Sequence, residues 1–184
     1  MNRMKLMVVA IFLAASTVAY AESEQHYGGA EDVAFAQKLW VALEDVRLTG
    51  PHGVYSAPYA GKPPHGAFLE TMTGVVEMEG ELLPVIVQRN YAGNQINRRA
   101  VADDPEKWLH AVSVMLKREG YAPKGKDWFW ASYAPDGALL RDKTNIPQAG
   151  KVAQGSSKGC IACHVMAPGG DMVFNHNRFA KEGS

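Results

Sequence analysis

Cysteine is scarce in this chain of 184 residues, which contains only Cys160 and Cys163. A disulfide between two cysteines so close in sequence closes a very small loop and would stabilise the fold little. The chain is therefore not a small scaffold held together by disulfides, and at this length it can bury a core without them. We expect the cysteine pair to serve a chemical function.

Long apolar runs and an excess of charge of one sign are also missing. The apolar run Met7–Ala15 is shorter than the roughly 20 residues that span a bilayer, and no later stretch is long enough. The 19 basic and 19 acidic residues cancel, so charge gives no reason to expect binding to nucleic acid or an anionic membrane. We expect no nucleic-acid partner and no membrane span.

The N-terminus has the three parts of a secretory signal peptide. Arg3 and Lys5 precede the apolar run, and Ala19-Tyr20-Ala21 forms an A-x-A cleavage signature. We therefore expect residues 1–21 to be removed as a signal peptide and residues 22–184 to form a single periplasmic domain.

The remaining patterns predict an α+β fold. Apolar side chains at three- and four-residue steps predict a helix over residues 30–48, and the Gly- and Pro-rich stretch 51–66 predicts a loop. Asp104-Pro105 predicts a short helical turn. Segments rich in β-branched and aromatic residues predict strands at 67–73, 84–91, 111–121 and 127–134. Together they indicate an antiparallel β-sheet of about four to five strands with an N-terminal helix and flanking helices.

The two cysteines belong to the run Cys160-Ile161-Ala162-Cys163-His164, which has the C-x-x-C-H pattern of c-type haem attachment. In that chemistry both thiols bond to haem vinyl groups and the adjacent histidine ligates the iron, so one motif accounts for all three residues. The single copy predicts one covalently attached haem c, with Cys160 and Cys163 binding the cofactor and His164 binding the metal. A structural disulfide, a thioredoxin-type redox pair and a zinc site with a ligand such as His176 are the alternatives.

The second axial position of the iron decides what such a haem does. A Met or His ligand suits electron transfer, whereas an open or weakly capped position suits small-molecule binding or catalysis. By residue type, and with none favoured by the sequence alone, the candidates are Met72, Met78, Met115, Met172, His52, His65 and His110.

The sequence contains, in this order, the segments "PPHGAFLETM", "PVIVQRNY", "SVMLKREGYAPKGKDWFWASYAPDGALL", "GCIACH" and "DMVF". This succession, from Pro63 to Phe174, resembles proteins of the cytochrome P-460 family. The resemblance implies a compact, mainly antiparallel sheet that holds one haem c, often in a homodimer. Members include hydroxylamine-oxidising enzymes and the cytochromes c′-beta, which bind nitric oxide at a five-coordinate iron.

One position departs from the hydroxylamine-oxidising members, in which a strand lysine is crosslinked to the haem edge. Alignment on "VIVQRNY" puts Gln88 in the place of that lysine, and an amide nitrogen cannot form the bond. The resemblance therefore implies that Gln88 lies at the cofactor and that the crosslink is missing. Strand alternation puts Ile86 and Asn90 on the face of Gln88, whereas Arg89 faces the other side. An alignment slip of one residue would bring in Arg89, which is always protonated and fails as a nucleophile too.

The sequence thus supports three functional hypotheses and does not decide whether the protein is an enzyme. The first is a periplasmic mono-haem cytochrome c with an open or weakly capped distal site for a small ligand such as nitric oxide. The second is a hydroxylamine-oxidising enzyme. The third is a six-coordinate electron-transfer cytochrome that works with a redox partner protein.

Overall fold

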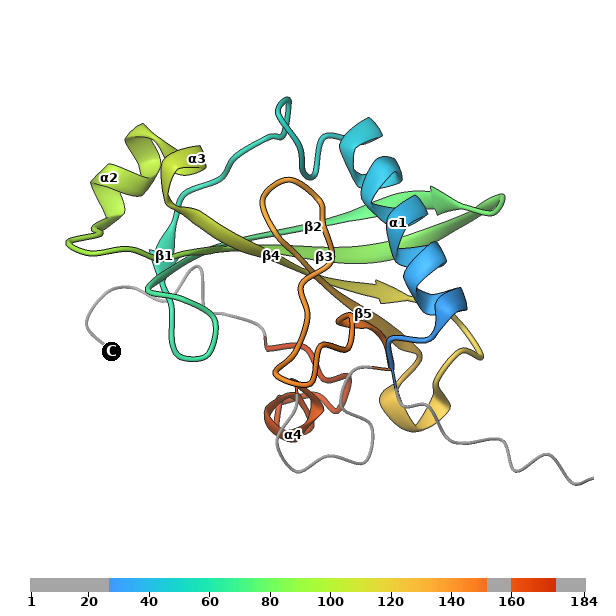
Figure 1. The fold of residues 1–184 in the computed structure, drawn as a ribbon. Helices are drawn as coiled ribbons and strands as arrows, with labels where there is room; N and C mark the ends of the chain where they lie inside the picture. The colour runs from blue at the N-terminus through green and yellow to red at the C-terminus, as the bar shows by residue number, and fades with distance from the viewer. Residues whose placement is uncertain (1–26, 152–159, 175–184) are drawn as a thin grey trace, which may run out of the picture.

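The computed structural model describes residues 27–151 and 160–174. Within these residues six strands form one antiparallel sheet in the order β1-β2-β3-β4-β5-β6 (Figure 1). The strands are β1 (Tyr59–Ala60), β2 (Phe68–Met78), β3 (Glu81–Tyr91), β4 (Leu109–Lys117), β5 (Trp128–Tyr133) and β6 (Ala149–Gly150). The helices are α1 (Ala30–Asp45), α2 (Arg98–Asp103), α3 (Pro105–Trp108) and α4 (Cys160–His164), with a 3-10 turn η1 (Pro123–Gly125). The predicted α+β class is confirmed; the predicted signal peptide and His176 lie outside the described residues.

The sheet is more extensive than the sequence pattern predicted. β2 and β3 form one long hairpin, because Glu79 and Gly80 adopt left-handed φ angles of 55° and 85° and so allow a two-residue turn. β4 ends at Lys117 rather than at residue 121, and a turn follows there. β1 and β6 were not predicted, since strands of two residues are too short to show an alternating pattern.

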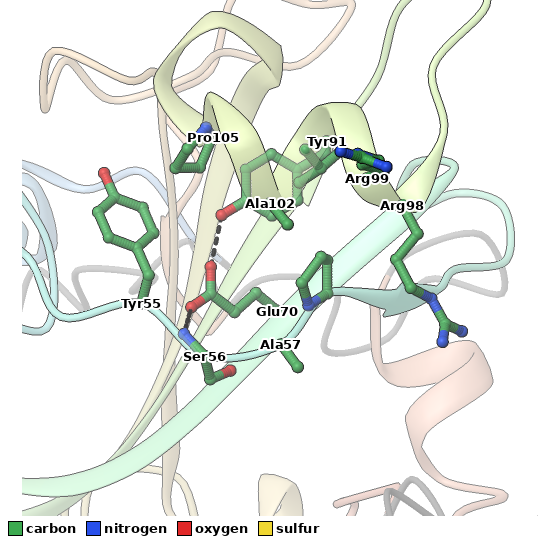
Figure 2. A pocket seen from close by; sticks show the side chains of 11 residues that line it. Tyr55, Ser56, Ala57, Glu70, Tyr91, Arg98, Arg99, Ala102 and Pro105 are labelled. Carbon is green, nitrogen blue, oxygen red and sulfur yellow. Dashed lines mark hydrogen bonds between the residues drawn. The ribbon is translucent and has the colours of Figure 1, made fainter.

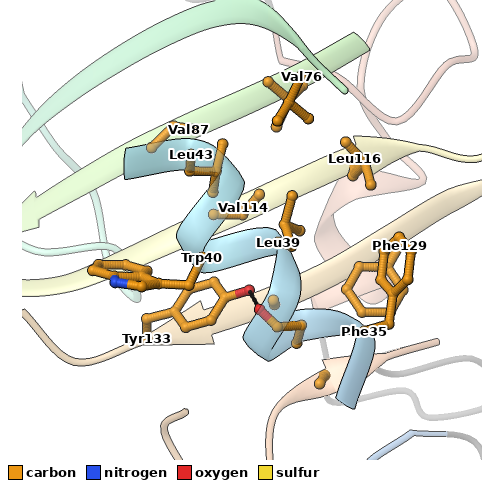
Figure 3. Close-up of a cluster of buried hydrophobic side chains, with 14 of the residues drawn as sticks. Phe35, Leu39, Trp40, Leu43, Val76, Val87, Val114, Leu116, Phe129 and Tyr133 are labelled. Carbon is orange, nitrogen blue, oxygen red and sulfur yellow. Dashed lines mark hydrogen bonds between the residues drawn. The ribbon is translucent and has the colours of Figure 1, made fainter. Parts of the chain in front are cut away.

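One face of the sheet packs against α1 and forms the main hydrophobic core. In Figure 3, Phe35, Leu39 and Leu43 of α1 point toward the strands. The predicted shared face of Val112, Val114 and Leu116 is confirmed as part of this core, and all three are buried. The helix ends at Asp45, earlier than predicted, and Val46 is 44% exposed.

The opposite face of the sheet carries a different set of side chains. A register row across four strands pairs Thr73 with Ile86, Ile86 with Met115, and Met115 with Trp130. α4 lies on this side, whereas α1 lies on the other (Figure 1). The sheet therefore separates the main core from the segment that carries the C-x-x-C-H motif.

The short helices follow local capping rules. The side chain of Asp104 accepts a hydrogen bond from the Lys107 backbone at 3.3 Å, and Pro105 occupies the first turn of α3. The predicted helical turn at Asp104-Pro105 is thus confirmed. α2 was not predicted; its cap is Asn97, whose side chain accepts from the Ala100 backbone at 2.9 Å.

Candidate functional site

The C-x-x-C-H motif forms α4 itself. Residues three apart on a helix lie on the same side, so Cys160 and Cys163 share one side of α4. Both are free thiols; Cys160 is half-buried and Cys163 is exposed. Burial raises the pKa of the Cys160 thiol, which favours the protonated form. No disulfide joins the two cysteines in this structure.

His164 is held in one orientation by the backbone that follows α4. Its Nδ1 lies 2.7 Å from the carbonyl oxygen of Met172. A carbonyl oxygen only accepts, so Nδ1 donates and Nε2 retains the lone pair with which imidazole binds metals. Burial lowers the pKa of His164, although the bond to Met172 acts in the opposite direction. The net effect favours the neutral ring, which is the form that ligates a metal.

Two aromatic rings pack against the imidazole of His164. The centroid of Trp130 lies 4.8 Å away at an interplanar angle of 84°, and that of Phe174 lies 5.4 Å away at 73°. The buried Nε1 of Trp130 has no hydrogen-bond partner among the described residues. Buried donors are rarely left unpaired, so an acceptor other than these residues is expected beside His164.

A cavity of about 420 Å³ opens in front of His164. That volume falls within the roughly 300–1,000 Å³ of small-molecule and cofactor sites. The β1–β2 loop, the sheet face opposite α1, and the α4 segment all contribute to its wall, notably through Lys62, Pro64, His65, Thr71, Thr73, Ile86, Gln88, Met115, Cys163, His164 and Phe174. One wall carries Cys163 and His164, whose Nε2 is available to bind a metal, and most of the other lining side chains are apolar. This combination fits a haem.

Gln88 lines the same cavity as His164, on the wall formed by β3. Its Nε2 donates to Oδ1 of Asn90 at 2.9 Å, and Nδ2 of Asn90 donates to Oγ of Ser113 at 3.0 Å. Ile86 lies beside Gln88 on the same wall, whereas Arg89 is buried on the α1 side of the sheet. The predicted alternation along β3 is therefore confirmed.

The candidate axial ligands divide into those at the cavity and those away from it. Only His65 and Met115 among the seven line the cavity. His52 and His110 are exposed elsewhere, and Met78 belongs to the core under α1. Met172 is buried beside α4 and contacts His164 through its carbonyl.

Sequence reasoning missed the groups that hold the imidazole. The Met172 carbonyl and the ring of Phe174 follow His164 within ten residues of chain, yet no sequence pattern marks a backbone carbonyl as a hydrogen-bond acceptor. Trp130 reaches His164 from β5, and only the folded sheet brings these two residues together.

A second cavity, of about 460 Å³, lies at another part of the sheet (Figure 2). The carboxylate of Glu70 in its wall accepts bonds from the Ser56 backbone and from the hydroxyl of Tyr91, and it pairs with Arg89 at 3.3 Å. Its buried acid already has partners at both oxygens. The lining of this cavity contains no cysteine, histidine or methionine.

The structure gives no support for a zinc site or a membrane span within the residues it describes. No group of three or more His, Cys, Asp or Glu side chains there could hold a metal ion. Likewise, none of the helices over the described ranges is both long and apolar enough to cross a bilayer.

Comparison with known proteins agrees with the geometry of this site. The family model for cytochrome P460 matches residues 83–175, which is half of the chain and includes most of β3, all of β4 and β5, and the C-x-x-C-H motif. No curated protein and no solved structure gives a significant match. The cavity wall formed by the sheet, the fixed orientation of His164 and the volume of the cavity all agree with this match. The chain belongs to the cytochrome P460 family and is a mono-haem cytochrome.

Proposed function

We propose that the haem is a haem c, held by thioether bonds to Cys160 and Cys163 and by an axial bond to His164. In each thioether bond the S–H adds across a vinyl C=C, with sulfur on one carbon and hydrogen on the other, so no oxidant is consumed. The observation that carries the proposal is His164, whose Nδ1 donates to the Met172 carbonyl at 2.7 Å and whose ring faces a cofactor-sized cavity.

We also propose that this cytochrome binds a small ligand such as nitric oxide at an open or weakly capped distal position. When bound, haem supplies an iron centre that can change oxidation state and accept a ligand on the side away from His164. The protein contributes the small side chains of Thr71 and Thr73 and the apolar side chain of Ile86 to one wall, which leaves room for a diatomic molecule. Gln88 supplies an amide on the same wall.

The proposal includes a haem without the lysine crosslink. Gln88 stands on the strand position of the crosslinking lysine and has no nucleophilic nitrogen. The lysine that does line the cavity, Lys62, lies on the β1–β2 loop and is exposed. Peptide mapping of the digested holoprotein should find haem on the peptide of Cys160 and Cys163 alone. A haem-bearing peptide that contains Lys62 would contradict this part of the proposal.

The ferrous absorption spectrum, recorded with and without nitric oxide, tests the ligand-binding function. We expect the spectrum to change on addition of the gas, and the denatured protein to give the pyridine haemochrome of ordinary haem c. A low-spin spectrum that ignores nitric oxide would contradict ligand binding. A shifted haemochrome would instead favour the hydroxylamine-oxidising class with its crosslink.

An electron-transfer cytochrome is the second candidate, and the position of Met115 favours it. The residue is buried to 8% exposure and lines the cavity that His164 faces. Ligation by its thioether would produce a methionine-to-iron charge-transfer band and would require a redox partner protein. Loss of that band in Met115→Leu would establish this function in place of ligand binding.

We further propose that the chain is exported to the periplasm, loses residues 1–21, and works there as a homodimer. The C-x-x-C-H motif and the leader pattern support export, because haem c is attached after translocation. The family resemblance supports the dimer, and sedimentation of the holoprotein tests it.

A further inference from the structure

The β1–β2 loop brings a second histidine to the cavity, from a point 99 positions away in the chain from His164. His65 is half-buried and lines the cavity in which Cys163 and His164 also lie. The centroids of the two imidazole rings are 6.1 Å apart, at an interplanar angle of 77°.

That separation fits one metal ion between two imidazoles. The ring centroids of two imidazoles on opposite sides of one metal ion would lie about 6.5 Å apart, because each bond is about 2.0–2.1 Å and each ring centre lies roughly 1.2 Å behind its nitrogen. The observed 6.1 Å is close to this value. His65 thus stands at the distance from His164 that the opposite axial ligand requires.

The base of the loop is fixed to the sheet, which determines where His65 lies. The backbone of Ala67 donates to Tyr91 at 3.0 Å, and that of Gly61 donates to Ala67 at 2.8 Å. Gly66 has a left-handed φ of 97°, and a Cβ there would lie 2.8 Å from the Tyr91 carbonyl oxygen. Only glycine permits this approach. The tip at residues 62–64, by contrast, is exposed.

Two other side chains of the cavity wall, Gln88 and Met115, have contacts of their own. The amide of Gln88 donates to Asn90. Met115 packs with Trp128, Trp130 and Met172 in a buried cluster on the sheet face. His65 and Phe174 both line the cavity and have rings close to His164, and of these two only the imidazole of His65 can bind a metal.

We infer that His65 is the second axial ligand of the resting iron and that a small ligand binds by displacing it. The inference rests on the proposed haem attachment, and it identifies His65 as the group that weakly caps the distal position. Because the loop base is fixed to the sheet, only the side chain of His65 and the exposed tip at residues 62–64 need to move for the ring to leave the cavity. If His65 occupies the position in about 90–99% of molecules, it lowers the apparent ligand affinity by about 10- to 100-fold.

The test compares the ferric holoprotein with His65→Ala by electron paramagnetic resonance and by near-infrared magnetic circular dichroism. We expect the wild type to be low-spin with two nitrogen ligands and His65→Ala to be high-spin. Added imidazole should restore the low-spin signal to the variant. The apparent affinity of the ferrous variant for carbon monoxide, used as the probe, should rise at least about 10-fold.

A matched control, a second variant and a mass measurement separate the outcomes. The control His110→Ala removes an exposed histidine away from the cavity and should keep the wild-type spectra. Met115→Leu removes the other candidate ligand, and a high-spin Met115→Leu would overturn the inference in favour of Met115. A high-spin wild type, or a low-spin His65→Ala without imidazole, would overturn the inference while the proposed function stands. Protein with the mass of bare polypeptide would overturn both. The wild-type dichroism spectrum identifies the ligands even if His65→Ala does not fold.

Discussion

Adjacent residues of β3 face different environments on the two sides of the sheet. Gln88 faces the cavity of His164, whereas Arg89 is 2% exposed and pairs with the equally buried Glu70. Arg89 also donates to the carbonyls of Val54 at 2.8 Å and Leu48 at 3.0 Å. A side chain with so many partners holds the chain between α1 and β1 onto the sheet.

Removal of this guanidinium should destabilise the fold strongly. Arg89→Met leaves the Glu70 carboxylate buried without its cation, a change that typically costs about 3–5 kcal/mol of unfolding free energy. Urea denaturation measures the loss. The control Arg99→Met breaks an exposed pair with Asp103 and should cost less than about 1 kcal/mol. Equal losses in the two variants would contradict the importance of burial.

The three residues of the haem motif should contribute separately to cofactor binding. Cys160→Ser and Cys163→Ser should each retain haem through the remaining thioether bond. The double variant should release its haem to acidified organic solvent. His164→Ala should keep the covalent haem but lose its axial ligand, which the absorption spectrum reports. Covalent haem in the double cysteine variant would contradict attachment at α4.

At the scale of the elements, the β1–β2 loop depends on the backbone conformation of a single glycine. Gly66 and Gly80 have similar left-handed φ angles of 97° and 85°. A Cβ at Gly66 would meet the Tyr91 carbonyl oxygen at 2.8 Å, whereas one at Gly80 has nothing within 4 Å. Comparing alanine substitutions at the two positions therefore separates the cost of left-handed backbone strain from the cost of a clash with the backbone of Tyr91.

Gly66→Ala should be more harmful than Gly80→Ala. Both variants pay the left-handed strain of about 1–2 kcal/mol, but only Gly66→Ala must also move the loop away from β3. We expect a larger loss of unfolding free energy in Gly66→Ala, measured by urea denaturation, and a change in the haem spectrum that Gly80→Ala lacks. Indistinguishable variants would show that the loop adapts without cost.

A hydrogen bond ties the segment before α1 to the loop between β5 and β6. The hydroxyl of Tyr27 donates to the carboxylate of Asp142, and this bond raises the pKa of Tyr27 to about 12. Because the pKa is raised in the folded state, the bond stabilises fully below the ordinary pKa of 10 and is lost as the pH rises toward 12. The denaturation midpoint of the wild type should fall more over that range than that of Tyr27→Phe. Parallel pH profiles would contradict this.

At the scale of the whole molecule, the sheet divides two functions between its faces. One face buries α1 and provides the main core, and the other forms a wall of the cavity. The core that stabilises the sheet therefore lies apart from the side chains that face His164. Changes at Gln88 or His65 can then alter the haem environment while the main core stays packed.

Export should be required for a complete holoprotein. Expression of the full chain in a bacterium that matures c-type cytochromes should yield periplasmic protein that begins at Glu22 and carries one haem. The matched control, residues 22–184 expressed without the leader, should accumulate as colourless polypeptide. Mass spectrometry of both fractions measures the result. Haem on the leaderless protein, or uncleaved exported protein, would contradict the assignment of residues 1–21.

The main elements were predictable from the sequence. The spacing of C-x-x-C-H predicts covalent haem attachment, because the porphyrin would dictate the separation of the three residues. The four long strands and α1 follow from alternating and helical apolar patterns, and the faces of Gln88 and Arg89 follow from the two-residue period of β3. These features depend only on neighbours along the chain.

Only the tertiary structure determines which residues lie next to His164. The sequence offered seven candidate axial ligands and favoured none of them. Packing of the β1–β2 loop against β3 places the ring centroid of His65 6.1 Å from that of His164. The same holds for Trp130 and the Met172 carbonyl, which orient the imidazole. Such contacts arise from the register of the sheet and from close backbone approach at Gly66, and no short stretch of sequence encodes either.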